Sequence, residues 1–276
     1  MSASFISLRN LVVSYGASAQ TRIDSLDIHE GSCHAFVGES GSGKTTVLLA
    51  MLGLLPPRVA RVEGSIKIGE HQITQDDGPR MREVRRRDIA MITQSPHGSF
   101  PATMRIGRFM YLALKARGLT SSEIKDRIAD SIQRVHLHAS ILDRYSFQIS
   151  GGQAQRCAIA LSVALRKPVI VADEPTSALD MTVQAGVISL LAEIRQEQRV
   201  TVVLISHDLA VVSQLADEIV VMKDGKVVEE GQTSEVLGSP RQNYTRELIR
   251  SIPVLTGAIE RTSGGSDQHG ESSKSS

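Results

Sequence analysis

One short stretch constrains this chain more than any other. Residues 38–45 read Gly-Glu-Ser-Gly-Ser-Gly-Lys-Thr and match the pattern G-x-x-x-x-G-K-[ST] at every fixed position. The apolar residues before it, 33–37, predict a buried strand, and the apolar run after it, 47–52, predicts a buried helix. A glycine loop between a strand and a helix is the context in which this pattern cradles phosphate. We therefore expect a nucleoside triphosphate site here, rather than a glycine-rich turn with a chance lysine.

The residue types in this loop suit that chemistry. Its glycines let the backbone curl until successive N–H groups face an anion, and the helix start adds unpaired donors and a positive dipole end. Lys44 would reach the β- and γ-phosphates, and the Thr45 hydroxyl would hold Mg²⁺. The residues expected to contact the nucleotide are Gly38, Glu39, Ser40, Gly41, Ser42, Gly43, Lys44, Thr45 and Thr46.

Composition narrows the protein class. A chain of 276 residues with 41% hydrophobic content can fill the core of one large domain, and its net charge of +1 favours neither nucleic acid nor an acidic partner. Cys33 and Cys157 lie in apolar runs, so we expect buried thiols in a reducing compartment. The first residues lack the pattern of a secretory signal, and no apolar run near the loop approaches the ~20 residues that span a bilayer. These features predict a cytosolic protein that acts at a membrane only if another subunit anchors it.

The order of elements predicts an α/β fold. A hairpin is indicated at Lys223-Asp224-Gly225, and residues 262–276 have the composition of a disordered tail. Between about residues 95 and 155 the pattern becomes helical, with Thr120 as a cap, which indicates a helical insertion. The predicted strands are 5–8, 11–13, 23–28, 65–68, 88–92, 169–172, 200–205, 218–222 and 226–229. The predicted helices after residue 95 are 106–115, 123–137, 152–165, 183–197 and 209–216.

Two polar groupings are expected to be structural. The arginines between residues 80 and 88 could form a nucleic-acid patch, but no aromatic residues interleave with them, so a solvated helix face is the favoured interpretation. His136 and His138 have no third ligand at metal-binding spacing, so we interpret them as surface or packing residues.

A pair of carboxylates follows a buried strand. Residues 169–172 are apolar, and Asp173 and Glu174 come directly after them. The carboxyl ends of parallel strands form the ligand-binding edge of an α/β sheet, and successive residues point to opposite sides. Asp173 is therefore predicted to reach the Mg²⁺ sphere, and Glu174 to polarise the water that attacks the γ-phosphate.

A second glycine-lined helix start lies at residues 150–153. Ser150 is placed to cap the helix, and Gly151 and Gly152 leave its backbone donors bare ahead of Gln153. One nucleotide does not need two such anion sites in one chain. Two copies could use both if each lends this motif to the other's phosphate loop.

In this order the motifs resemble the ATP-binding subunits of ABC transporters. The resemblance rests on residues 38–45, Gln94, 149–153, 169–174, 177–180 and His207, and it spans about residues 4–250. It implies a P-loop NTPase (RecA-like) core with a parallel sheet, an N-terminal antiparallel β subdomain and an inserted α-helical subdomain. It also implies an ABC ATP-binding domain over residues 1–254, with the insertion at about 95–155, and a flexible C-terminal tail over 255–276.

The resemblance also implies roles for individual residues. Tyr15 would stack on adenine, Gln94 would contact Mg²⁺ or water while sensing the membrane partner, and His207 would hold the γ-phosphate. Asp180 would lie in the dimer seam, near the signature residues Ser150, Gly151, Gly152 and Gln153, which would read the opposite subunit's phosphate. The implied catalytic residues are Glu174, His207 and Gln94, and the implied Mg²⁺ ligands are Thr45, Gln94 and Asp173. The signature opens with Ile149 where leucine is usual.

Several stretches are similar to the peptide and nickel importer group. They are residues 53–56, 62–64, 94–96, 207–209 and 243–248 with Ile252-Pro253. Oligopeptide members of the group often carry a cysteine-rich C-terminal segment, whereas this chain has no cysteine after Cys157. That difference favours a nickel, metallophore or opine system over an oligopeptide system, with a small peptide as the other candidate substrate.

The resulting prediction is a bacterial importer ATPase that uses ATP and Mg²⁺. Its expected partners are a second ATP-binding subunit, as a homodimer or paralogue heterodimer, two integral membrane permeases, and indirectly a solute-binding protein, but no nucleic acid. It would lie peripherally on the cytoplasmic face of the inner membrane. One alternative is a soluble ABC-type ATPase acting on nucleic acid or ribosomes; another is a P-loop kinase, against which residues 150–153 argue.

Overall fold

The strands of this protein form one large sheet. The computed structural model describes residues 4–16, 19–73, 78–177 and 179–251. Within them the strands are joined in the order β5-β4-β1-β2-β10-β9-β3-β8-β7-β6. In chain order these strands are β1 (Ser4–Tyr15), β2 (Ala19–His29), β3 (Cys33–Val37), β4 (Ala60–Ile68), β5 (His71–Ile73), β6 (Ile89–Ile92), β7 (Val169–Asp173), β8 (Thr201–Ile205), β9 (Glu218–Lys223) and β10 (Lys226–Gln232).

A parallel half and an antiparallel half of the sheet meet beside β9. Strands β6, β7, β8, β3 and β9 run parallel, whereas β1, β2, β4 and β5 pair antiparallel. Strand β10 folds back on β9 and meets β2 through one parallel pair, Lys226 with Arg22. This arrangement confirms the predicted α/β class, with a parallel core and an N-terminal antiparallel subdomain.

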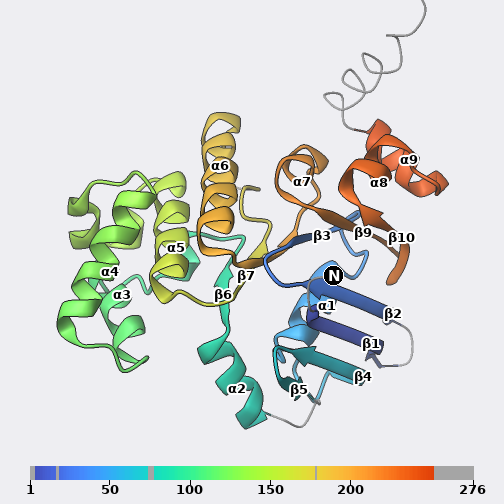
Figure 1. The fold of residues 1–276 in the computed structure, drawn as a ribbon, viewed down its shortest axis with the longest axis horizontal. Helices are drawn as coiled ribbons and strands as arrows, with labels where there is room; N and C mark the ends of the chain where they lie inside the picture. Colours follow the sequence, from blue (N-terminus) through green and yellow to red (C-terminus); the bar gives the residue numbers. More distant parts are fainter. Residues whose placement is uncertain (1–3, 17–18, 74–77, 178, 252–276) are drawn as a thin grey trace, which may run out of the picture.

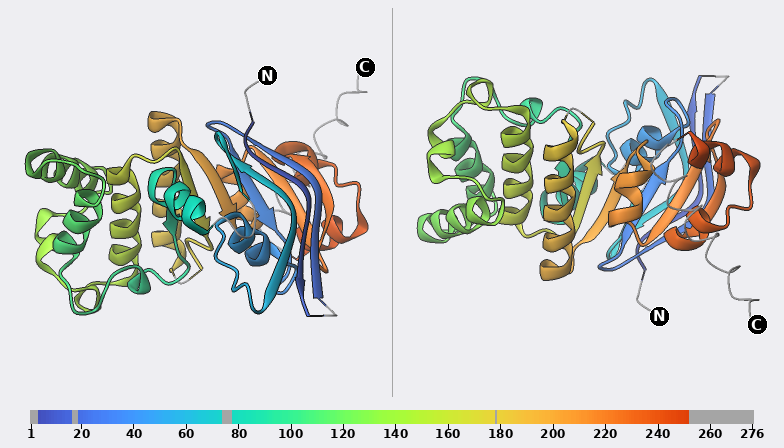
Figure 2. Two further views of the ribbon diagram at one scale, coloured as in Figure 1. Left: turned by 90° about the horizontal axis from the view of Figure 1, so that it is seen from below. Right: turned by 90° about the horizontal axis from the view of Figure 1, so that it is seen from above.

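The helices flank the parallel half and extend it at one end. In Figure 1, α3 and α4 lie at the opposite end of the molecule from the antiparallel strands, and both views of Figure 2 keep this separation. No helix among the described ranges is both long and apolar enough to cross a bilayer. The helices are α1 (Lys44–Met51), α2 (Gly78–Arg87), α3 (Ile106–Lys115), α4 (Ser121–Arg134), α5 (Gly151–Leu165), α6 (Met181–Gln198), α7 (Leu209–Leu215), α8 (Thr233–Gly238) and α9 (Asn243–Arg250), with 3-10 turns η1 (His97–Ser99), η2 (Ala139–Asp143) and η3 (Ser146–Gln148).

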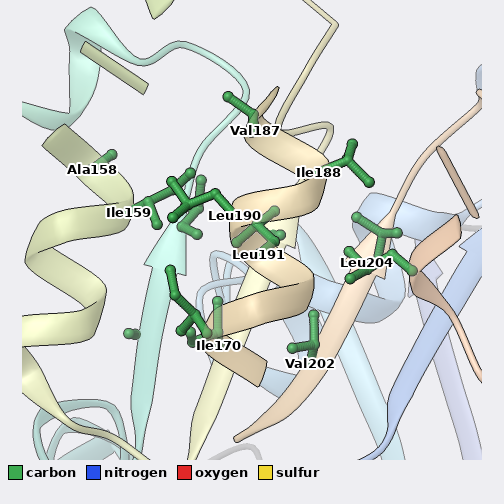
Figure 3. Close-up of a cluster of buried hydrophobic side chains, with 14 of the residues drawn as sticks. Ala158, Ile159, Ile170, Val187, Ile188, Leu190, Leu191, Val202 and Leu204 are labelled. Carbon is green, nitrogen blue, oxygen red and sulfur yellow. The ribbon is translucent and has the colours of Figure 1, made fainter. Parts of the chain in front are cut away.

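Side chains of the parallel strands alternate between two cores. On β8, Val202 and Leu204 pack in the core that contains α5 and α6, whereas Val203 and Ile205 belong to the core around α1 and the antiparallel strands. Figure 3 shows Leu191 of α6 in the first of these cores, together with Val202 and Leu204. Successive strand residues point to opposite faces, so a strand covered on both faces needs apolar residues at every position. This explains why the sequence is apolar at nearly every position of strands such as β7 and β8.

The first strand and one helix differ from their predicted bounds. The sequence predicts separate strands over residues 5–8 and 11–13, but β1 is continuous from Ser4 to Tyr15. It passes Asn10 in the left-handed region at φ 48°, and its register against β4 shifts between Arg9 and Val12, which is the irregularity that the sequence suggested as a break. Helix α4 begins at a complete Thr120 capping box and ends at Arg134 instead of residue 137, because His136 has φ 54°.

Other expectations are confirmed, and some lie outside the described ranges. Helix α3 has its predicted bounds, the hairpin of β9 and β10 is present, and both cysteines are buried. The inserted helical subdomain is present as α3 and α4, while the limits given for the domains stay a prediction. The proposed tail at 255–276 falls outside the described residues, as do Ile252 and Pro253.

The basic run forms helix α2, as predicted. Met81 and Val84 are its buried residues. Arg85 Nη1 donates to the carbonyl of Leu52, the C-cap of α1, at 2.5 Å, and this bond links α2 to the end of α1. Arg86 forms an exposed ion pair with Glu83 at 2.7 Å. These contacts give part of the arginine run a structural role.

The turn between β9 and β10 yields a stability prediction. Asp224 and Gly225 have φ 48° and 77°, the signs that a type I′ turn requires. A Cβ on Gly225 would lie 2.1 Å from the Gln20 carbonyl oxygen. We expect Gly225→Ala to destabilise the protein by roughly 2–4 kcal/mol, since it combines left-handed strain with a main-chain clash.

Gly118→Ala is the matched control. Gly118 has φ +80° but nothing within 4 Å of an added Cβ, so it should lose only about 1 kcal/mol. Urea unfolding of both variants checks the difference. Equal losses would show that the close approach of the hairpin to Gln20 adds nothing to the free energy of unfolding that Gly225→Ala removes.

Candidate functional site

The predicted phosphate loop connects β3 to α1, and its backbone needs glycine. Gly38 has φ 146°, and a Cβ there would lie 2.2 Å from the Met222 carbonyl oxygen of β9. Gly43 occupies the N-cap of α1 in a left-handed conformation, and it makes no side-chain cap to the first turn. The start of α1 therefore keeps main-chain donors that a phosphate could take up.

Lys44 is buried and is held by the loop that precedes it. Its Nζ donates to Gly38 O at 2.8 Å, Glu39 O at 2.8 Å and Ser42 Oγ at 3.2 Å, and the residue is only 6% exposed. Burial lowers the pKa of Lys44, while the carboxylates of Glu174, Asp173 and Glu39 act in the opposite direction. Three neutral acceptors thus position a cation inside the loop.

A cavity of about 440 Å³ opens beside this lysine. The lining does not include Gly38, Glu39 or Ser42, which instead accept hydrogen bonds from Lys44. Its lining residues are Tyr15, Gln20, Thr21, Ser40, Gly41, Gly43, Lys44, Thr45, Thr46, Glu174, Asp224 and Gly225. The cavity therefore brings the predicted aromatic, lysine, hydroxyl and carboxylate groups together.

Glu174 is held by the two polar residues predicted to act with it. Gln94 Nε2 donates to Glu174 Oε2 at 2.8 Å, and His207 Nδ1 lies 3.0 Å from Glu174 Oε1. These residues follow β6, β7 and β8, whose carboxyl ends share one edge of the sheet. The backbone of Glu174 lies at φ 45°, a conformation that costs about 1–2 kcal/mol for a residue with a side chain. Such strain at a cavity is typical of functional positions.

Asp173 lies next to this group in a less favourable environment for charge. Burial raises the pKa of Asp173, the negative charge of Glu174 adds to that effect, and Lys44 opposes it. A partly buried carboxylate whose charge Lys44 offsets only in part is suited to a cation that arrives with a ligand.

The second glycine motif does not join this cavity. Residues 150–153 start α5 with a complete capping box: Ser150 Oγ accepts from Gln153 N at 3.3 Å, and Gln153 Oε1 accepts from Ser150 N at 3.0 Å. A Cβ on Gly152 would lie 2.6 Å from Val183 Cγ1 of α6. The chain thus holds this motif against α6, apart from the lining of its own cavity.

Asp180 caps α6. Its Oδ1 accepts from Thr182 N at 3.1 Å and Val183 N at 3.0 Å, so it has a local structural role in the described chain. Of the stretch 177–180, Ala178 lies outside the described residues. The dimer-seam role of Asp180 remains a prediction.

Some site residues were missed by the sequence reasoning. Gln20, Thr21, Asp224 and Gly225 line the cavity because β2 and the hairpin tip lie beside the loop, with Gly225 N donating to Ser42 O at 3.1 Å. Only the hairpin itself had a sequence signal. The capping box of Ser150 and Gln153 did have a sequence signal, because serine followed three residues later by glutamine is the capping-box pattern.

Known proteins are similar to this chain in sequence and in fold. The sequence profile of the ABC transporter family matches residues 22–177. The chain is 36% identical over 231 residues to the oligopeptide transport ATP-binding protein OppD of Lactococcus lactis subsp. cremoris, covering 83% of this chain and 68% of that protein. It is 36% identical over 258 residues to the dipeptide transport ATP-binding protein DppD of Bacillus subtilis, covering 91% and 77%. Among solved structures, the dimeric ATP-binding cassette MJ0796 bound to ADP and Pi has a TM-score of 0.71 at 27% identity, covering 83% of this chain and 98% of that chain.

The environment of Asp173 predicts a gain in stability on removal of its charge. The pKa of Asp173 is raised in the folded protein, so the folded state binds this proton more tightly than the unfolded chain. The ionised carboxylate therefore destabilises the fold above its folded pKa, and this cost disappears below the ordinary value of 3.8. We expect Asp173→Asn, without nucleotide, to raise the free energy of unfolding by about 0.5 kcal/mol or more near neutral pH.

Urea unfolding at several pH values checks this expectation. The gain should shrink as the pH is lowered through the folded pKa. The control is Asp126→Asn on the exposed side of α4, which should change stability little. If Asp173→Asn unfolded more easily than the wild type at neutral pH, the conclusion that the ionised carboxylate destabilises the fold would be wrong.

Proposed function

Because this chain belongs to the family of ABC transporter ATP-binding subunits, which are ATP-hydrolysing transport ATPases, we propose that it powers a peptide importer of the bacterial cell membrane. The observation that carries the proposal is the placement of Glu174. Its carboxylate borders the cavity of the phosphate loop while Gln94 and His207 hold its two oxygens. That geometry suits the hydrolysis of a terminal phosphate.

The residues of the cavity fit a nucleotide. The β- and γ-phosphates would accept from the Lys44 ammonium in place of one of its three loop acceptors, and from the uncapped main-chain donors at the start of α1. Tyr15 lines the cavity together with Ser40 and Gly41 of the loop and Thr46 of α1, where an aromatic ring could stack on adenine.

The same site fits Mg²⁺ only together with a nucleotide. No group of three Cys, His, Asp or Glu side chains in the described ranges could hold a metal by itself. Mg²⁺ is commonly held by one or two protein ligands, waters and substrate phosphates. Thr45, Asp173 and Gln94 are the proposed protein ligands, and the raised pKa of Asp173 reflects a carboxylate that such a cation would relieve. Bound Mg²⁺ would neutralise phosphate charge.

In the proposed reaction a water attacks the γ-phosphorus of ATP and the bond to the β–γ bridging oxygen breaks, giving ADP and phosphate. The Glu174 carboxylate orients this water by a hydrogen bond and takes up its proton as the bond to phosphorus forms. Gln94 and His207 keep the carboxylate directed at the cavity, and His207 is proposed to contact the γ-phosphate as well.

We propose that two ATP-binding subunits enclose the nucleotides. The signature residues 150–153 lie outside the lining of the chain's own cavity, so they are available to a partner's nucleotide. Asp180 would lie in the seam between the subunits. The dimeric form of MJ0796 with ADP and Pi supports this arrangement. The partner would be a second copy or a paralogue.

The proposed substrate is a peptide. The relatives OppD and DppD are named for oligopeptide and dipeptide transport, which favours a peptide over the nickel or metallophore alternative. By analogy the chain would lie on the cytoplasmic face of the membrane, bound to two permeases that receive peptide from a solute-binding protein. The second candidate, an ABC-type ATPase acting on nucleic acid, has less support, because Arg85 and Arg86 of the basic helix contact protein groups.

The substitution Glu174→Gln tests the mechanism. The amide can keep both contacts, with its oxygen toward Gln94 and its NH₂ toward His207, but it cannot act as a base. We expect hydrolysis to fall by ~10²-fold or more while ATP binding survives. The variant should also accumulate as an ATP-bound dimer, alone or with its paralogue, because removal of a carboxylate reduces repulsion against the γ-phosphate. Phosphate release and light scattering measure the two effects.

Two further variants serve as controls. Glu193→Gln makes the same change on the exposed face of α6 and should hydrolyse ATP normally. Adding Ser150→Arg to Glu174→Gln should abolish the dimer, since the signature helix must approach the partner's nucleotide. Normal hydrolysis by Glu174→Gln, or a monomer in the presence of ATP and the paralogue, would refute the proposed mechanism.

A further inference from the structure

One peptide unit of the phosphate loop is held at both ends by side chains. It joins Gly38 to Glu39. Its carbonyl oxygen accepts from Lys44 Nζ at 2.8 Å, and its N–H donates to the Tyr244 hydroxyl at 3.1 Å. A carbonyl that accepts a hydrogen bond makes the N–H of the same amide a better donor, so the two bonds strengthen each other. Tyr244 and Lys44 therefore contact the two ends of a single peptide group.

Tyr244 is fixed in place by the C-terminal part of the described chain. It lies in the first turn of α9, whose start is anchored by Glu229 of β10. The Glu229 carboxylate accepts from the main-chain N–H groups of Arg241 at 2.7 Å and Gln242 at 3.1 Å. Lys223 Nζ lies 4.6 Å from the centroid of the Tyr244 ring, a cation–π contact from the end of β9. The start of α9 and the ring of Tyr244 are thus positioned by contacts other than the loop.

The Glu39 N–H is not directed at the cavity, although loop amides of this kind usually bind phosphate. Since it donates to Tyr244 and Glu39 does not line the cavity, this amide is not available to a phosphate in the described conformation. Tyr244 also lies beyond residues 22–177, the part of the chain that the family profile matches. The contact therefore adds a support for the loop from outside that segment.

We propose that Tyr244 is a positioning residue for nucleotide binding: its hydroxyl fixes the 38–39 peptide and so keeps Lys44 at the edge of the cavity. The inference rests on the proposed role of Lys44 as a phosphate ligand. Without the hydroxyl, the peptide loses its second anchor and can rotate, so that Gly38 O no longer directs the ammonium. The loop must then be ordered when nucleotide binds, and affinity falls while the bound complex reacts as before.

Tyr244→Phe tests this proposal, because it removes the hydroxyl and keeps the ring under Lys223. We expect the Kd for ADP, measured by calorimetry, and the KM for ATP to rise about five- to tenfold, the loss of one hydrogen bond. The kcat at saturating ATP should stay within about twofold of wild type. Tyr111→Phe is the matched control: it removes a hydroxyl bonded to Ser121 Oγ at 2.9 Å in the helical subdomain, and it should leave nucleotide affinity unchanged.

A double-mutant cycle separates this inference from the proposed site. If the hydroxyl acts through Lys44, then Lys44→Ala with Tyr244→Phe should bind ADP no more weakly than Lys44→Ala alone. Additive losses would overturn the route through the lysine. Wild-type affinity in Tyr244→Phe, or an equal loss in Tyr111→Phe, would overturn the role of Tyr244 and leave the site intact. Wild-type affinity in Lys44→Ala would overturn the proposed site and the inference with it.

Discussion

The buried ammonium of Lys44 is the interaction on which the site depends. Removing a charge from water is costly unless hydrogen bonds replace the lost hydration. Here two main-chain carbonyls and the Ser42 hydroxyl do so at 2.8 Å, 2.8 Å and 3.2 Å, and no carboxylate pairs with the lysine among the described residues. The loop must therefore keep its curled shape for Lys44 to remain buried, and that shape is the one a phosphate would meet. The cost of ordering the loop falls on folding rather than on binding.

The loop keeps that shape because both halves of the sheet reach it. The Met222 carbonyl of β9 lies against Gly38, and Gly225 at the tip of the hairpin donates to Ser42 O at 3.1 Å. Gly225 O in turn accepts from Arg22 N of β2 at 2.7 Å. β10 and β2 pair at a single position, Lys226 with Arg22, so this small contact joins the antiparallel subdomain to the parallel core beside the loop. The adenine side and the phosphate side of the proposed site thus belong to different halves.

Local patterns made the loop, the carboxylate pair and the helix start at Ser150 predictable, because each depends on residues close in sequence. The meeting of Gln94, Glu174 and His207 could also be anticipated, since all three follow parallel strands. The left-handed backbone of Glu174 had no signal, as a non-glycine residue rarely adopts it. Nor did the contact of Tyr244 with the loop, which joins positions 205 residues apart. Such contacts depend on how the C-terminal helices pack, which periodicity does not encode.

The two glycine-lined helix starts differ in a way that makes them complementary. Helix α1 has Gly43 as its N-cap, so it lacks a side-chain cap, and its first residue, Lys44, lines a cavity. Helix α5 begins with a closed capping box between Ser150 and Gln153, which fixes its first turn. The box satisfies the N–H groups of Ser150 and Gln153 and leaves those of the two glycines between them without an intrahelical acceptor. One start therefore supplies charge and a cavity, and the other supplies rigid, neutral donors, so each is half of the site that the proposed dimer would complete.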